Sequence, residues 1–125
     1  MKPDSVKDLY LAIRKAFPVC VHQADIDHER KGFEEDDEAY SLWFESFACA
    51  TNDAMNSSEN NEVADIFVLV SNFYENSGPS VKKCLDSSYV ENLFWKCSKE
   101  DINNYWDLLP NNLKSLYISF HGGKP

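Results

Sequence analysis

The sequence predicts an all-α fold, a single-domain bundle or stack of about five to six short helices that spans residues 1–125. The chain has only four glycines and no Asn-Gly or Asp-Gly pair between alternating apolar residues, so β-hairpins are not indicated. Apolar residues recur at helical spacing instead. The length of 125 residues suits one domain, and 43% hydrophobic with 14% aromatic residues suffices for a packed core.

The first helix is expected to begin at Ser5 and to end before Pro18. Ser5 and Asp8 form an approximate capping box, and apolar residues follow at helical spacing as far as Phe17. Residues 18–33 lack a clean period. The sequence leaves open whether they form a short strand or a loop.

A second helix is expected from about Glu35 to Met55, with acids at 34–38 in a first turn that the helix dipole favours. One face of it is apolar: Tyr40, Trp43, Phe44, Phe47, Ala48, Thr51, Ala54 and Met55. A third helix is expected from about Asn61 to Asn76. It is apolar over so much of its circumference that we expect it to be central.

Three more helical segments complete the prediction. The first follows Ser77-Gly78-Pro79 and continues to about Trp95, and a break at Ser87-Ser88 is left open. Ser98-x-x-Asp101 opens a short helix, and Pro110-Asn111-Asn112 opens the last one, which His121-Gly122-Gly123 closes.

Negative charge is concentrated in one part of the chain. The formal net charge is −9, and residues 21–80 contain fourteen acids and two bases. This is the opposite of the basic surface of nucleic-acid binders, so we expect no direct contact with nucleic acid. The densest part runs from Asp25 to Glu38.

The expected location is the cytoplasm. The first residues contain no apolar run long enough for a signal peptide, and 18 consecutive apolar residues occur nowhere in the sequence, so we expect no membrane contact. The four cysteines lie far apart without a CxxC pair, which favours buried free thiols over disulfides or zinc ligands.

Recognisable catalytic motifs are absent, so we expect no enzyme and no cofactor. The chain contains no GxSxG, GxGxxG, HExxH or phosphate-binding glycine loop. A calcium loop counted from Asp25 fails because Arg30 stands where glycine is required. An enzyme or metal protein that uses His22, Asp25, Asp27 and His28 stays as a third hypothesis.

The acidic segment is interpreted as a partner-binding surface, since a field of one sign steers a basic partner and raises its association rate. Phe33, beside Gly32 and a run of acids, is the aromatic anchor candidate. Solvation of a helix start is the simpler alternative. The predicted contacts are Asp25, Asp27, Glu29, Phe33, Glu34, Glu35, Asp36 and Asp37.

Residues 40–120 resemble a known family. Its most distinctive pieces here are Ala50-Thr51-Asn52 and Leu109-Pro110-Asn111-Asn112-Leu113. The chain resembles the small all-helical bacterial immunity proteins of contact-dependent growth inhibition and polymorphic toxin systems. The resemblance implies a cytoplasmic antitoxin that binds a cognate toxin, commonly a nuclease, and blocks its active site or substrate groove. It carries over no catalytic residues and does not include residues 18–38.

These two lines of reasoning agree, because nuclease toxins are typically basic in order to hold phosphate. The leading hypothesis is therefore an immunity protein with an acidic contact surface. The alternative is a cytosolic helical adaptor that binds a peptide or a partner helix.

Overall fold

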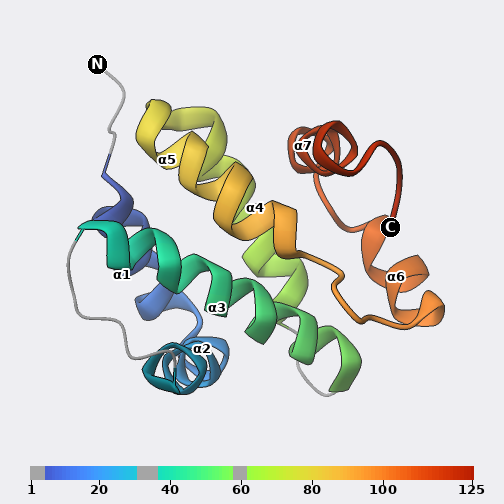
Figure 1. Cartoon of the computed structure of the whole chain (residues 1–125), viewed down its shortest axis with the longest axis horizontal. Coiled ribbons are helices and arrows are strands. Elements are labelled where there is room, and N and C mark those ends of the chain that lie inside the picture. The colour runs from blue at the N-terminus through green and yellow to red at the C-terminus, as the bar shows by residue number, and fades with distance from the viewer. Residues whose placement is uncertain (1–4, 31–36, 58–61) are drawn as a thin grey trace.

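The computed structural model describes residues 5–30, 37–57 and 62–125, and in these ranges it confirms an all-α fold without strands (Figure 1). Seven α-helices are present in the described ranges, more than the five to six predicted, because residues 18–30 form a helix of their own. Their bounds are α1 (Val6–Ala16), α2 (Pro18–Arg30), α3 (Asp37–Ser57), α4 (Glu62–Asn76), α5 (Pro79–Cys84), α6 (Lys99–Trp106) and α7 (Asn111–His121).

The predicted start of the first helix is confirmed. Ser5 is the N-cap of α1, and its Oγ accepts a hydrogen bond from the Asp8 amide at 3.1 Å. Leu9 and Ile13 are completely buried on the inner face. The helix ends at Ala16, one residue before Phe17 and two before Pro18, because proline disfavours helical geometry in the residue that precedes it.

The open question at residues 18–33 is resolved as a helix, α2, as far as Arg30. Proline is tolerated in a first helical turn, so Pro18 ends α1 and begins α2. The apolar period is weak because the buried face of α2 consists of three small or medium side chains, Cys20, Val21 and Ala24. Val19, by contrast, is 66% exposed. Neither a strand nor a loop is formed here.

The central helix is α3 and not α4. α3 packs against α1, α2, α4, α6 and the segment that follows α5. Of its predicted apolar face, Tyr40 is half-buried and the other seven residues are buried, Thr51 included. The expectation for α4 was wrong because apolar composition alone does not decide position: Val68 of α4 is 54% exposed.

The helix that begins at Pro79 changes its hydrogen bonding instead of breaking. After α5 the chain continues as a π-helix, Leu85–Tyr89, and then as a 3₁₀ turn, Val90–Asn92. The π segment is a widened turn, a feature frequent at functional sites. It buries Leu85 and Tyr89 completely while the two serines between them stay partly or fully exposed.

The last two helices are confirmed with their capping residues. The Ser98 Oγ accepts from the Asp101 amide at 3.1 Å at the start of α6. At the end of α7, Gly122 adopts a left-handed conformation with φ 79°, which favours glycine. Trp106 and Tyr117 join these helices through an edge-to-face contact with ring centroids 5.5 Å apart.

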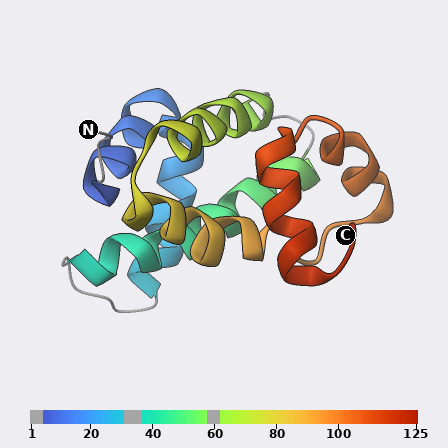
Figure 2. The ribbon, with the colours of Figure 1, turned by 90° about the horizontal axis from the view of Figure 1, so that it is seen from above.

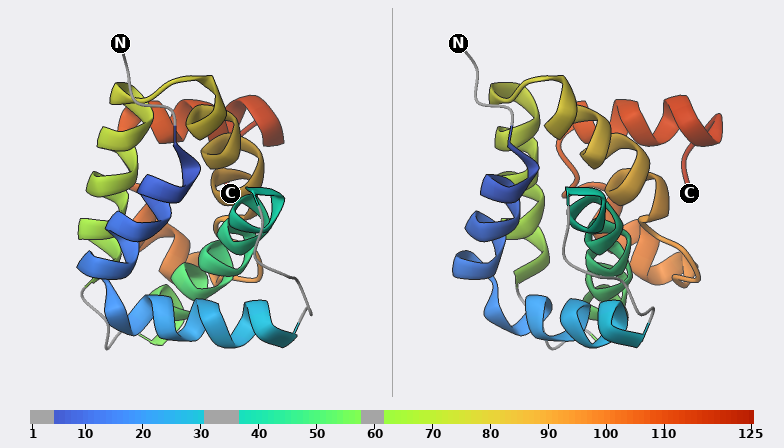
Figure 3. Two further views of the ribbon diagram at one scale, coloured as in Figure 1. Left: turned by 90° about the vertical axis from the view of Figure 1, so that its left-hand side faces the viewer. Right: turned by 60° about the vertical axis from the view of Figure 1, so that its left-hand side comes forward.

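The helices from the two ends of the sequence lie at opposite ends of the molecule. α1 and α2 form one end, and α6 and α7 form the other (Figures 1 and 2). α2 runs across the base of the other N-terminal helices, whereas α7 lies across the opposite side (Figure 3). The acidic α2 is thereby separated from α6 and α7.

Candidate partner-binding surface

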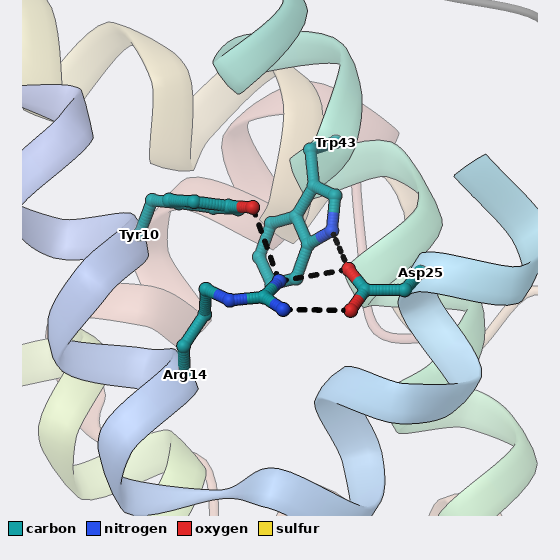
Figure 4. A network of polar contacts seen from close by, with 4 residues as sticks. All are labelled: Tyr10, Arg14, Asp25 and Trp43. Carbon is teal, nitrogen blue, oxygen red and sulfur yellow. Dashed lines mark hydrogen bonds and ion pairs between the residues drawn. The ribbon is translucent and has the colours of Figure 1, made fainter. Parts of the chain in front are cut away.

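Asp25 of α2 is the centre of a polar network that joins three helices (Figure 4). Arg14 of α1 binds both carboxylate oxygens: Nη1 lies 2.8 Å from Oδ1 and Nη2 lies 2.9 Å from Oδ2. The Trp43 indole of α3 donates a third hydrogen bond to Oδ1 at 3.0 Å. Arg14 Nη1 also donates to the Tyr10 hydroxyl at 3.0 Å. The network therefore fixes α2 against both α1 and α3.

The electrostatics of this network favour the ionised carboxylate. Burial alone would raise the pKa of Asp25, but the hydrogen bonds from Arg14 and Trp43 outweigh it and lower the pKa below its usual value. The same hydrogen bond to Asp25 raises the pKa of Arg14. Because 36% of the Arg14 side chain and 30% of the Asp25 side chain are exposed, solvent screens the pair, and we expect only a modest contribution to stability.

Asp25 therefore has an internal role that the sequence did not predict. Both of its oxygens bind groups of the same domain, so its charge is largely balanced in the free protein. Its partner Arg14 is eleven residues away on another helix. The weak periodicity of residues 18–30 did not predict a helix. Without that helix, the sequence gives no indication that the two side chains meet.

Of the predicted contact residues, Asp27 and Glu29 have described side chains and, unlike Asp25, no ion pair within the described part of the domain. Asp27 is half-buried and Glu29 is exposed on α2, and neither forms an ion pair with a described residue. Asp37 begins α3, and its side chain is not described. Phe33, Glu34, Glu35 and Asp36 lie outside the described residues.

Asp53 of α3 belongs to the same surface, although the sequence analysis did not single it out. Desolvation raises the pKa of Asp53, and the nearby negative charge of Asp27 raises it further. The two carboxylates thus influence each other from neighbouring helices. We define Asp27, Glu29 and Asp53 as the acidic edge.

The described residues present no cluster of metal ligands, and burial disfavours the thiolate of Cys20. Within residues 5–30, 37–57 and 62–125, no three His, Cys, Asp or Glu side chains are placed to hold a metal ion. All four cysteines are free thiols, with Cys20 and Cys84 buried and Cys49 and Cys97 partly buried. Burial raises the pKa of Cys20 to about 12, so its thiol is protonated and a poor nucleophile near neutral pH.

Thr51 and Asn112, from the two motifs that carry the family resemblance, form hydrogen bonds inside the domain. Thr51 Oγ1 donates to the Phe47 carbonyl at 2.8 Å and lies 3.1 Å from the Tyr89 hydroxyl. Asn112 Nδ2 donates to the Ser71 carbonyl at 3.1 Å and to Glu75 Oε1 at 3.0 Å, which joins α7 to α4. Thr51 and Asn112 therefore help to hold elements of the fold together.

No helix in the described part of the chain is long and apolar enough to cross a membrane. No curated protein and no solved structure matches the chain. A family model described as "Domain of unknown function (DUF7674)" matches residues 10–122, from within α1 to the glycine that caps α7. The chain therefore belongs to the DUF7674 family.

Proposed function

We propose that this protein is a cytoplasmic immunity protein, which binds a cognate bacterial toxin and neutralises it without catalysis and without a cofactor. The single observation that carries the proposal is the acidic edge. Asp27, Glu29 and Asp53 present negative charge from α2 and α3 with no ion-pair partner among the described residues.

Carboxylates without an ion-pair partner among the described residues favour the binding of a basic protein. A toxin that cuts nucleic acid needs a basic groove to hold phosphate, and an acidic edge of this kind occupies such a groove by charge complementarity. Direct contact of this chain with nucleic acid is disfavoured by the same charge. The mutual repulsion of Asp27 and Asp53 is relieved when a cationic side chain lies between them, which favours association.

Growth rescue tests the proposal directly. Whichever gene lies directly upstream of this one is expressed alone and together with this chain, and growth and partner binding are measured. Rescue of growth together with a stable complex supports the proposal. A neighbouring gene product that is not toxic, or toxicity that this chain does not relieve, contradicts it.

The electrostatic part is tested with matched charge reversals. Asp27→Lys with Glu29→Lys changes the net charge by the same amount as Glu100→Lys with Asp107→Lys. Both control residues are exposed, Glu100 in α6 and Asp107 at its C-cap. At low salt we expect the α2 pair to slow association by about tenfold and the control pair by less than about twofold. Equal slowing by both pairs would show that only net charge matters.

A helical adaptor is the alternative, and exposed aromatic side chains favour it. Trp95 is 67% exposed and Phe120 is 56% exposed, both in the C-terminal part of the chain. An adaptor that binds through them predicts that Trp95→Ala and Phe120→Ala weaken partner binding more than the α2 charge reversals do.

A further inference from the structure

A pocket of about 720 Å³ lies between the start of α1, the first part of α3 and the segment that begins with α5. This volume falls in the range of pockets that hold small organic ligands. α1 packs against α5, and α3 packs against the π-helix Leu85–Tyr89, so four elements of secondary structure define its walls. The acidic edge contributes no residue to it.

The charge of the pocket is opposite to that of the whole chain. Lys7 from α1 and Lys83 from α5 line it, and no Asp or Glu is among its described lining residues. Neither lysine forms an ion pair with a described residue. In a chain of net charge −9, two lysines from separate helices that line one pocket without an ion-pair partner among the described residues favour an anionic ligand.

Hydroxyl groups add hydrogen-bonding capacity. Five serines line the pocket. The hydroxyls of Ser80 and Ser88 form no hydrogen bond with a described residue, whereas Ser87 already donates to the Lys83 carbonyl at 2.7 Å. Ser87 and Ser88 belong to the π-helix and lie between the fully buried Leu85 and Tyr89. Phosphate oxygens accept hydrogen bonds from both lysine and serine.

Apolar surface completes the pocket and limits its chemistry. Val6, Tyr40 and Leu42 line it beside the polar groups, so a ligand with an apolar or aromatic body is favoured. The remaining candidate nucleophile, Cys84, is buried, and burial raises its pKa to about 11. The thiol is therefore protonated near neutral pH, and the lining indicates binding and not covalent catalysis.

We propose that this pocket binds a small organic phosphate, with the phosphate between Lys7 and Lys83, the serine hydroxyls as further donors, and the apolar body against Tyr40 and Leu42. The proposal is independent of the proposed toxin partner, because it involves different residues and a different class of ligand.

The test is a titration of the full chain, in which binding is measured from the NMR chemical shifts of the backbone amides. The probes are AMP, inorganic phosphate and uncharged adenosine. We expect AMP to shift amides of the pocket with a Kd tighter than about 1 mM, and each of the other two probes to bind more weakly. Lys7→Met and Lys83→Met should each weaken AMP binding by about fivefold. Lys15→Met, on the exposed side of α1 outside the lining, is the matched control and should change it by less than about twofold.

Each other result overturns the proposal. No pocket shifts with AMP up to about 10 mM would show that the pocket binds no organic phosphate. If Lys15→Met weakens AMP binding as much as Lys7→Met and Lys83→Met do, the effect comes from the overall charge and not from the pocket. Inorganic phosphate that binds as tightly as AMP would show that the apolar wall contributes nothing. Folding of each variant is checked from the dispersion of the same spectra.

Discussion

The two ends of this molecule are held together by different chemistry. At the N-terminal end, a partly exposed ion pair between Arg14 and Asp25, supported by Trp43, joins α1, α2 and α3. At the C-terminal end, the buried neutral amide of Asn52 binds the segment before α6. An aromatic cluster around Trp106 and Tyr117 packs beside it. In this molecule the charged pair lies where water screens it, and the neutral amide and the aromatic rings lie where little surface is exposed.

Removal of the Asn52 amide should have the largest effect. Its Nδ2 donates to the Asn92 carbonyl at 2.9 Å and its Oδ1 accepts from the Phe94 amide at 2.8 Å. Asn52→Ala leaves the buried Phe94 amide and the partly buried Asn92 carbonyl without this partner, so we expect a loss of about 2–4 kcal/mol in the free energy of unfolding, measured by urea denaturation. The exposed Asn103→Ala serves as control and should change it by less than about 0.5 kcal/mol. If Asn52→Ala lowers the free energy of unfolding no more than the control does, the Asn52 amide does not hold the C-terminal end together.

The helix caps should affect the two ends equally. Ser5 and Ser98 each accept a hydrogen bond from a backbone amide three residues later, both at 3.1 Å. Ser5→Ala and Ser98→Ala should each lower the free energy of unfolding by about 1 kcal/mol, since each removes one N-cap. Ser119→Ala, exposed on α7, is the control. A large effect at only one end would contradict the equal contribution of the two caps.

The Arg14–Asp25 pair should contribute less, and its contribution should depend on pH. A double-mutant cycle with Arg14→Met and Asp25→Asn should give a coupling of about 0.5–1 kcal/mol, smaller in high salt because the pair is partly exposed.

The sign of the pH effect follows from the lowered pKa of Asp25. The folded state favours the carboxylate, so the stabilisation is complete above the usual pKa of about 3.9 and is lost as pH falls through the lower folded value. The stability difference between the parent and Asp25→Asn should therefore shrink between about pH 5 and pH 2. A difference that stays constant over this range would contradict an ionic role. The effect of Asn52→Ala should not follow this profile.

Asp53→Asn should have the smallest effect and the opposite sign. Because its pKa is raised, the ionised form of Asp53 is disfavoured in the folded state, and this cost is present near neutral pH and disappears on acidification. Asp53 is exposed, so the substitution should stabilise the protein by no more than about 0.5 kcal/mol at pH 7, measured by denaturation. The proposed function expects the same substitution to slow partner association, whereas destabilisation at pH 7 would contradict the repulsion with Asp27.

Much of this fold could be predicted because its signals are local. The caps at Ser5 and Ser98 each depend on side chains three residues apart, and the left-handed Gly122 is a single-residue signal. α2 was not predicted because its buried face consists of Cys20, Val21 and Ala24, which give little amphipathic contrast. The π-helix was not predicted because its extra residue is accommodated by packing, and no local pattern encodes it.

The candidate site was less predictable because its residues come together only in three dimensions. The excess of acids in residues 21–80 indicated the region that contains Asp25, Asp27 and Asp53, but it did not separate Asp25, which binds Arg14, from Asp27, which does not. Asp53 joins them from a helix whose path relative to α2 no periodicity specifies. The pocket likewise combines residues 7, 40 and 83, which are distant in the sequence.

The hydrogen bond from the Trp43 indole to Asp25 has a practical consequence. The three tryptophans occupy three environments: Trp43 is buried beside a carboxylate, Trp106 is buried among aromatic rings, and Trp95 is largely exposed to water. Replacing any two of them by phenylalanine leaves a single fluorophore that reports on one part of the protein. Loosening of the α1–α2–α3 junction and of the α6–α7 end thereby becomes visible separately, in the same chain and without an attached dye.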